Sequence, residues 1–95
     1  MHIIEFQEMM RQLYLQRDLE RGTKGTYNWL VEEVGELGEA LENNNKEAAK
    51  KEFADVLAWL ASLANSAGID LETAALEKYN HKCPKCGYSP CRCCF

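Results

Sequence analysis

The amino-acid sequence predicts an all-α protein, a small bundle of about four helices followed by a short cysteine-rich tail. Two observations carry this prediction. Residues 1–82 contain no proline, the residue that most strongly interrupts helices, and both prolines of the chain follow them. Apolar side chains recur at helical spacing over the same part of the chain. We therefore expect one helical domain over residues 1–82 and a tail over residues 83–95.

The first two helices are expected on either side of a glycine-containing segment. Helical apolar spacing runs from about residue 3 to about residue 19. Residues 20–25 contain two glycines and interrupt the pattern. Thr26 or Asn28 is a suitable N-cap for a second helix, which should end at the asparagines 43–45.

Two further helices follow after short connections. Asn45 is expected to cap a helix that runs to about Ser66, before Gly68. Asp70 is expected to cap the last helix, over about residues 71–82. Because the connections are short, neighbouring helices should be antiparallel.

Length and charge limit the classes of function. A chain of 95 residues forms one domain, and a bundle this small buries a limited core, so we expect a homodimer or homotetramer. Eleven basic against fifteen acidic residues give a net charge of −4, which argues against nucleic-acid binding and against a basic membrane-surface helix. The chain has no long apolar run and no signal-peptide pattern at its start, so we expect a cytoplasmic protein.

Two acidic motifs carry the strongest functional signal. The first is Glu32-Glu33-x-x-Glu36, and the second is Glu52-x-x-Asp55. On a helical wheel, Glu33 lies at the border between the acidic and apolar faces, and Glu52 lies within about 40° of the apolar stripe of its helix. An unpaired carboxylate in that position is costly, and no basic residue shares the stripe.

A shared metal ion would compensate these carboxylates. Acidic residues at i and i+3 are neighbours on a helix, so two such pairs on facing helices present four carboxylates to one point. Oxygen ligands of this kind suit Mg²⁺ or Mn²⁺, which also take phosphate oxygens. Alone, the first motif would more often form a solvated helix face. Together with the second motif, which lies at the apolar border of its helix, it favours a metal site.

The two motifs resemble those of the MazG-like nucleoside triphosphate pyrophosphohydrolases, in the all-α NTP pyrophosphatase superfamily. The resemblance covers about residues 1–80 and includes the glycines at 35 and 38 and the segment Val56-Leu57-Ala58-Trp59 after the second motif. It implies an oligomeric helical bundle whose sites are completed between subunits. It also implies Mg²⁺-dependent hydrolysis of a (d)NTP to (d)NMP and pyrophosphate, as in nucleotide-pool housecleaning.

The resemblance also implies roles for single residues. Glu33, Glu36, Glu52 and Asp55 look like the Mg²⁺ ligands, and Glu32 looks like a group that orients or deprotonates water or supports a ligand. Substrate contacts are expected from three further residues, namely Lys78 and Asn80 near the end of the last helix and Trp29 at the start of the second. Trp29 is more often a packing residue at such a position. Arg17, Arg21 and Lys24 are weaker candidates for the positive charge that phosphates need, because the expected role of each is a solvated loop charge.

The tail contains all five cysteines of the chain, in Cys83-Pro-Lys-Cys86 and in the segment from Cys91 to Cys94. Cys-Pro-x-Cys-Gly resembles a zinc knuckle, and Cys91 with Cys93 or Cys94 would complete a four-cysteine Zn²⁺ site. His81 is an alternative ligand. A disulfide or redox pair and a free tail are the weaker alternatives, and the tail departs from the family pattern.

Two other functions stay open from the sequence. One is a phosphoribosyl-ATP pyrophosphohydrolase-like activity, because such enzymes share a related acidic pattern. The other is a helical dimeric scaffold whose zinc tail, with Lys82, Lys85 and Arg92, binds a protein or nucleic acid.

Overall fold

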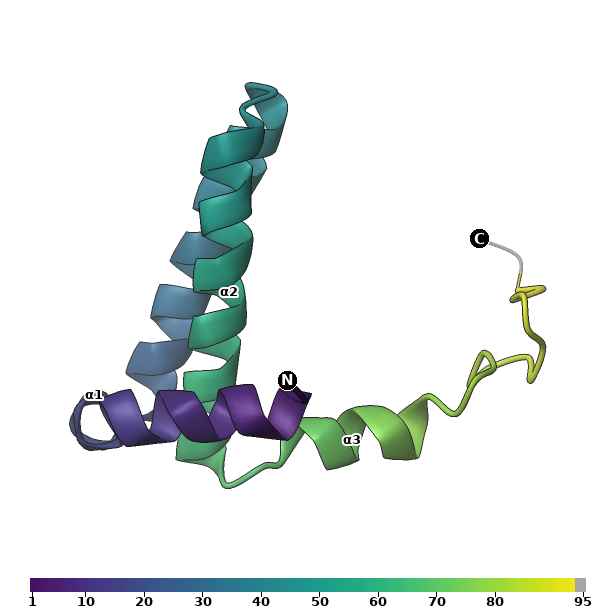
Figure 1. The fold of residues 1–95 in the computed structure, drawn as a ribbon, viewed down its shortest axis with the longest axis horizontal. Helices are drawn as coiled ribbons and strands as arrows, with labels where there is room; N and C mark the ends of the chain where they lie inside the picture. Colours follow the sequence, from purple (N-terminus) through teal and green to yellow (C-terminus); the bar gives the residue numbers. More distant parts are fainter. Residues whose placement is uncertain (94–95) are drawn as a thin grey trace.

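The protein is all-helical in the computed structural model, which describes residues 1–93. Its elements are α1 over Ile3–Glu42, α2 over Lys46–Ala67 and α3 over Leu71–Lys78, and the described residues form no strand (Figure 1). The all-α fold class is therefore confirmed. Three helices are present rather than about four, because α1 contains both of the first two predicted helices.

The long helix α1 is interrupted at Gly22, where the chain changes direction (Figure 1). Gly22 has φ 82° and ψ 165°, a conformation that glycine adopts without the steric cost of a Cβ atom. The predicted break within residues 20–25 is thus confirmed. The helix resumes at once, so the expectation that Thr26 or Asn28 begins a helix is wrong. Thr26 lies inside the helix and donates its hydroxyl proton to the Gly22 carbonyl at 2.9 Å.

Both predicted asparagine and aspartate caps are confirmed. The Asn45 side chain accepts a hydrogen bond from the Ala48 N–H at 3.1 Å and begins α2. The Asp70 carboxylate accepts one from the Thr73 N–H at 3.1 Å and begins α3. Each side chain satisfies a backbone donor that the first helical turn leaves without a partner. These caps set the register of the helices that follow.

The helix ends are also determined locally. Gly68 ends α2 in the left-handed conformation, with φ 70°, as its position in the sequence predicts. The last helix ends earlier than predicted, at Lys78 rather than near Lys82, because Tyr79 already has an extended backbone. Residues 79–93 contain no helix or strand.

The helices pack around α1, which contacts both α2 and α3. The C-terminal segment of α1 runs antiparallel to α2, while the N-terminal segment of α1 crosses the lower end of α2 (Figure 1). Buried Gln7 ties this crossing to the turn after α2. Its side-chain amide donates to the Ile69 carbonyl at 2.7 Å and to Asn65 Oδ1 at 3.0 Å, and its Oε1 accepts from the Leu71 N–H at 2.9 Å. A buried polar network of this kind fixes one relative position of the segments.

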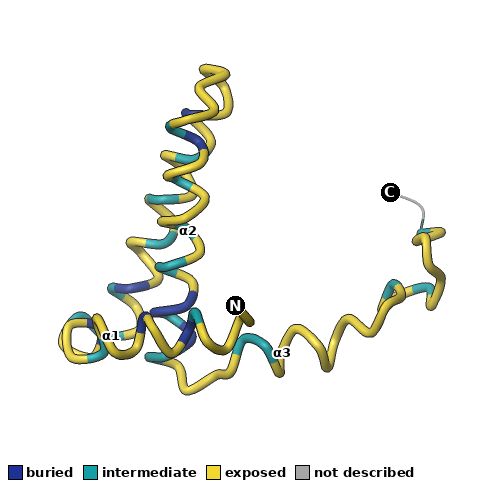
Figure 2. The backbone as a smooth tube through the Cα atoms, viewed as in Figure 1, coloured by how far each residue is buried: buried dark blue, intermediate teal, exposed yellow. Residues whose placement is uncertain are grey.

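The buried apolar core is small. It consists of Met10, Ala40, Ala49, Ala61 and Ala64, whereas larger apolar side chains remain substantially exposed along both long helices (Figure 2). Alanines allow two helices to approach closely, but they bury little apolar area. Across the described residues, no helix combines the length and apolarity that a membrane crossing requires.

Candidate active site

Three carboxylates converge where the C-terminal segment of α1 faces α2. Glu33 and Glu36 are neighbours on α1 at the i and i+3 spacing, and Glu52 comes from α2. Each offers one carboxylate oxygen, and the three oxygens lie within 4.8 Å of one another. Helix packing thus brings together residues that are separated by the whole Asn43–Asn45 turn.

The electrostatics of this cluster are unfavourable for three bare carboxylates. The Oε2 atoms of Glu33 and Glu52 are buried and have no hydrogen-bond partner. The pKa of Glu33 is raised from 4.5 to about 7, chiefly by burial and then by the neighbouring Glu36 carboxylate. Negatively charged oxygens that are close together, partly desolvated and unpaired fit a hard divalent cation. These carboxylate oxygens are therefore suitable ligands for Mg²⁺ or Mn²⁺.

Asp55 and Glu32 lie beside the three carboxylates. Asp55 follows Glu52 by one turn of α2, and its negative charge contributes to the raised pKa of Glu33. Its oxygens lie outside the group within 4.8 Å. Glu32 precedes Glu33 on α1 and is exposed to solvent. Both residues remain near the cluster, at positions where they can contact substrate or water.

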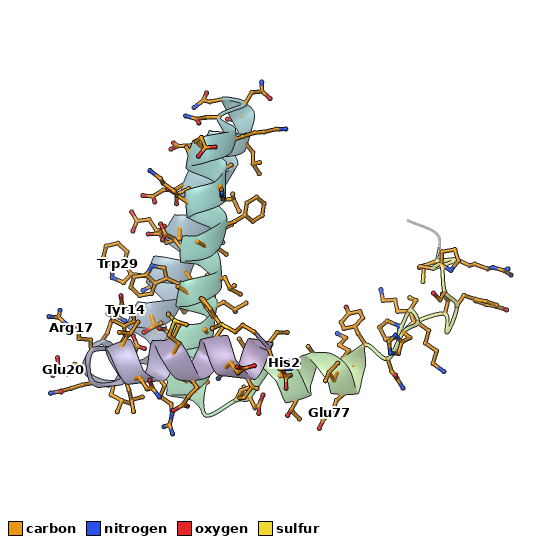
Figure 3. The ribbon with its side chains drawn as sticks, in the orientation of Figure 1. His2, Tyr14, Arg17, Glu20, Trp29 and Glu77 are labelled. Carbon is orange, nitrogen blue, oxygen red and sulfur yellow. The ribbon has the colours of Figure 1, made fainter. Side chains whose placement is uncertain are left out.

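A cavity of about 550 Å³ adjoins the cluster through Asp55. It lies between the N-terminal segment of α1 and the middle of α2. Its walls comprise Tyr14, Arg17, Asp18, Arg21, Asp55, Ala58, Trp59 and Ser62. Tyr14 and Arg17 lie on the same side of the molecule as Trp29 (Figure 3). Two arginines and two aromatic rings next to a carboxylate cluster form a site with room for an anionic, ring-containing molecule.

Arg21 is the site residue that sequence reasoning missed. The expectation that it is a solvated loop charge is wrong, because its guanidinium bonds to the buried Asp18 carboxylate at 2.8 Å. The guanidinium also lies 4.7 Å from the centroid of the Trp59 ring, in a cation–π arrangement. The only hint in the sequence is that Asp18 and Arg21 have i and i+3 spacing directly before a glycine break.

The two tryptophans form a stacked pair. Their ring centroids are 5.7 Å apart, and the ring planes differ by 14°. Trp59 is part of the cavity wall, while Trp29 is 47% exposed. Trp29 therefore packs on one face and leaves surface accessible beside the cavity.

Lys78 and Asn80 are not brought to the carboxylates within one chain. Lys78 ends α3, and its Nζ lies 5.9 Å from the centroid of the Tyr79 ring. Glu77 of the same helix lies on the opposite side of the molecule from Trp29 (Figure 3).

Gly35 and Gly38 have open space around them. A Cβ atom built on either glycine would meet nothing within 4 Å. A close approach of another helix, a common reason for glycine inside a helix, is therefore absent at both positions within the described part of the single chain. Each glycine costs about 1 kcal/mol in a helix relative to alanine.

The tail contains a second convergence of side chains. Cys83, Cys86, Cys91 and Cys93 place their sulfur atoms within 4.8 Å of one another, and none of the four forms a disulfide. His81 is not part of this group. Cys94, the alternative ligand considered from the sequence, lies outside the described residues.

Comparison with known proteins supports one family. Residues 21–87 match the model of the MazG nucleotide pyrophosphohydrolase domain. The search of curated proteins gave no match. The matched segment exceeds half of the chain. It contains both acidic motifs, Arg21, which directly precedes the break at Gly22, and the first pair of tail cysteines. The chain therefore belongs to the MazG nucleotide pyrophosphohydrolase family.

Proposed function

We propose that this protein is a Mg²⁺-dependent nucleoside triphosphate pyrophosphohydrolase. It cleaves a (d)NTP between the α and β phosphates, releases (d)NMP and pyrophosphate, and clears aberrant or surplus nucleotides from the cytoplasm. One observation carries this proposal, namely that Glu33, Glu36 and Glu52 converge with two buried oxygens that lack partners. Such a cluster needs a cation, and the bound cation in turn attracts a triphosphate.

Four residues would hold the cation. Glu33, Glu36 and Glu52 supply the converging oxygens, and Asp55 can join them from its place at the rim of the cavity. When bound, Mg²⁺ supplies positive charge that neutralises phosphate oxygens and makes water more acidic. Manganese is an alternative cation, because it prefers the same oxygen ligands.

The cavity beside Asp55 would bind the nucleotide. Arg17 makes no ion pair among residues 1–93 and lines the wall, so its charge is available to a phosphate group. Arg21 is held in place by Asp18 and by the Trp59 ring, and it offers further positive charge with little loss of side-chain entropy. The exposed surface of Trp29 is suited to stack on a base.

Glu32 would act on the water molecule that attacks the α phosphorus. It is exposed, it belongs to the first acidic motif, and it lies next to Glu33 in the chain. A carboxylate at this position can accept the proton of the water or hold the water in line with the scissile bond. Arg17 and Arg21 would then stabilise the charge that develops on the leaving pyrophosphate.

A second copy of the chain would complete the site. Val31, Val34 and Phe53 are each about half exposed near the carboxylates, and the open space around Gly35 and Gly38 lies on the same segment of α1. Packing of another chain there would bury this apolar surface and explain the glycines. In a homodimer or homotetramer of this kind, Lys78 and Asn80 of a neighbouring copy can reach the triphosphate.

The test is a panel of canonical and modified (d)NTPs with Mg²⁺, analysed for all products. Monophosphate and pyrophosphate are the expected products, and release of orthophosphate as the first product would contradict the proposed bond cleavage. Phosphoribosyl-ATP belongs in the same panel, because its hydrolysis would point to the related activity instead. Glu36→Gln should abolish turnover, whereas Glu39→Gln, an exposed position one turn along α1, should leave it unchanged.

A further inference from the structure

The proposed hydrolase mechanism makes no use of the cysteine-rich tail. Residues 79–93 extend away from α1 and α2 and are exposed along most of their length (Figures 1 and 2). They bury no apolar core of their own. A segment of this size keeps one conformation only if something other than apolar packing holds it.

The backbone of the tail nevertheless forms a defined turn. The Gly87 N–H donates to the Cys83 carbonyl at 2.8 Å, and the Cys83 N–H donates to the Tyr88 carbonyl at 3.0 Å. Gly87 has φ 76°, a value that favours glycine, directly after Cys86. This turn brings the sulfurs of Cys83 and Cys86 to the same side of the backbone, as in a zinc knuckle.

The distances between sulfur atoms identify the kind of site. Cys83 Sγ lies 3.6 Å from Cys93 Sγ, and Cys86 Sγ lies 3.9 Å from Cys91 Sγ. Four sulfurs at about 2.3 Å from a zinc ion, at the corners of a tetrahedron, are about 3.8 Å apart. A disulfide requires about 2.05 Å. The two measured distances lie on either side of the tetrahedral value and far from the disulfide value.

Backbone donors point at the sulfurs. The Arg92 N–H donates to Cys86 Sγ at 3.3 Å, and the Cys93 N–H donates to Cys91 Sγ at 3.2 Å. Hydrogen bonds of this kind stabilise thiolates, the form in which cysteine binds metals.

The surrounding charge is also complementary. Four thiolates and one Zn²⁺ carry a net charge of about −2. Lys82, Lys85 and Arg92 lie in the same segment and supply positive charge, and the Arg92 guanidinium lies 4.4 Å from the centroid of the Tyr88 ring. These positive side chains would therefore offset the negative charge of the metal-bound cysteines.

We propose that Cys83, Cys86, Cys91 and Cys93 bind one structural Zn²⁺ ion in a closed tetrahedral site. All four positions around the metal are taken by protein sulfur, so the ion holds the tail together and does not act on substrate. Four thiolates in tetrahedral arrangement suit Zn²⁺ or iron, and the metal content of the purified chain distinguishes the two.

The experiment measures metal in the full chain, purified under reducing conditions without chelator. We expect about one zinc ion per chain by elemental analysis. Cys83→Ser, Cys86→Ser, Cys91→Ser and Cys93→Ser should each lose most of that zinc. Circular dichroism of each variant checks that the helices remain, and cobalt substituted for zinc should give the absorption bands of a tetrahedral thiolate site.

Cys94→Ser and His81→Ala are the matched controls, and both should retain full zinc. Loss of zinc in Cys94→Ser with retention in Cys93→Ser would overturn the ligand assignment. Absence of zinc, presence of iron, or disulfides found by mass spectrometry under the same conditions would overturn the proposal. Glu36→Gln should keep its zinc, so the outcome is independent of whether the helical body hydrolyses nucleotides.

Discussion

The protein gathers candidate metal ligands in two different ways. In the carboxylate cluster, the ligands stand on two helices whose packing holds the oxygens of Glu33, Glu36 and Glu52 within 4.8 Å. In the tail, the sulfurs of Cys83, Cys86, Cys91 and Cys93 converge from a segment without helix or strand. The helices supply a scaffold that does not need the metal, whereas the tail has only its turn and the proposed zinc ion.

This difference separates catalysis from structural support. A site on helices keeps its geometry while the cation, the substrate and the products exchange, which a catalytic site requires. The two helices hold one carboxylate oxygen of Glu33 and one of Glu52 buried without hydrogen-bond partners. In the tail, which has no apolar core, the proposed zinc ion would supply the folding free energy and could not exchange during turnover.

The largest expected effect is on catalysis. Glu36→Gln removes one ligand charge from the cluster and should lower kcat/KM at least about a hundredfold, since even residues behind metal ligands cost up to that much when mutated. Stability should not fall, because a charge that repels Glu33 is removed. Steady-state kinetics and thermal unfolding measure both quantities. Near-normal activity in Glu36→Gln would contradict the metal-site assignment.

The second prediction separates the tail from the body. Removing zinc with a thiol-reactive reagent and a chelator should make residues 79–93 sensitive to protease while the helix content stays unchanged. Apparent zinc-binding free energies of structural sites are about 10–16 kcal/mol, all of which the tail would lose. Limited proteolysis and circular dichroism monitor the two regions. A simultaneous loss of helix would mean that the body depends on the tail.

The third prediction concerns the buried ion pair that supports the cavity. Arg21→Ala leaves the Asp18 carboxylate, 2% exposed, without its partner and should lower the free energy of unfolding by about 2–3 kcal/mol. Arg11→Ala is the matched control, because the Arg11–Glu8 pair is about half exposed on both sides and should contribute at most about 1 kcal/mol. Chemical denaturation of both variants gives the comparison. Equal effects would show that Arg21 has no special structural role.

The smallest expected effect is a pH dependence of the metal-free body. The fold raises the pKa of Glu33 from 4.5 to about 7, so between these values the unfolded chain loses the proton first. The free energy of unfolding should therefore fall as pH rises from about 4.5 to about 7. Thermal unfolding of chelator-treated protein tests this.

Glu33→Gln is the control for that pH dependence, because it keeps the shape of the side chain and removes the titrating group. The decline should flatten in this variant, and adding Mg²⁺ to the unmodified chain should restore stability most at the higher pH values. A decline that is unchanged in Glu33→Gln would assign it to other groups.

Much of the fold follows from local patterns. The caps at Asn45 and Asp70 and the end at Gly68 were predictable because each depends on the chemistry of a few adjacent residues. The helix start expected near Thr26 and the helix end expected near Lys82 differ from those in the structure. Gly22 alone absorbs the change in direction, so the helix resumes within a single residue, and the last helix ends where Tyr79 becomes extended.

The candidate site divides in the same way. The exposure of Glu32 and the buried oxygens of Glu33 and Glu52 agree with their positions on the helical wheel. Arg21 escaped prediction because its role depends on Trp59, which is far away in the chain. Lys78 and Asn80 remain predictions, since α3 and the segment after it lie away from the carboxylates (Figure 1).

By itself, the sequence determined the helices, the i and i+3 spacing of the acidic pairs and the clustering of cysteines in the tail. These are local properties, set by periodicity, capping and chain spacing. The tertiary structure alone decided that Glu52 meets Glu33 and Glu36, that Arg21 lies over Trp59, and that Cys93 joins the other three sulfurs. Those contacts join residues from different helices or from opposite ends of a turn, and only packing and backbone direction determine how far apart they lie.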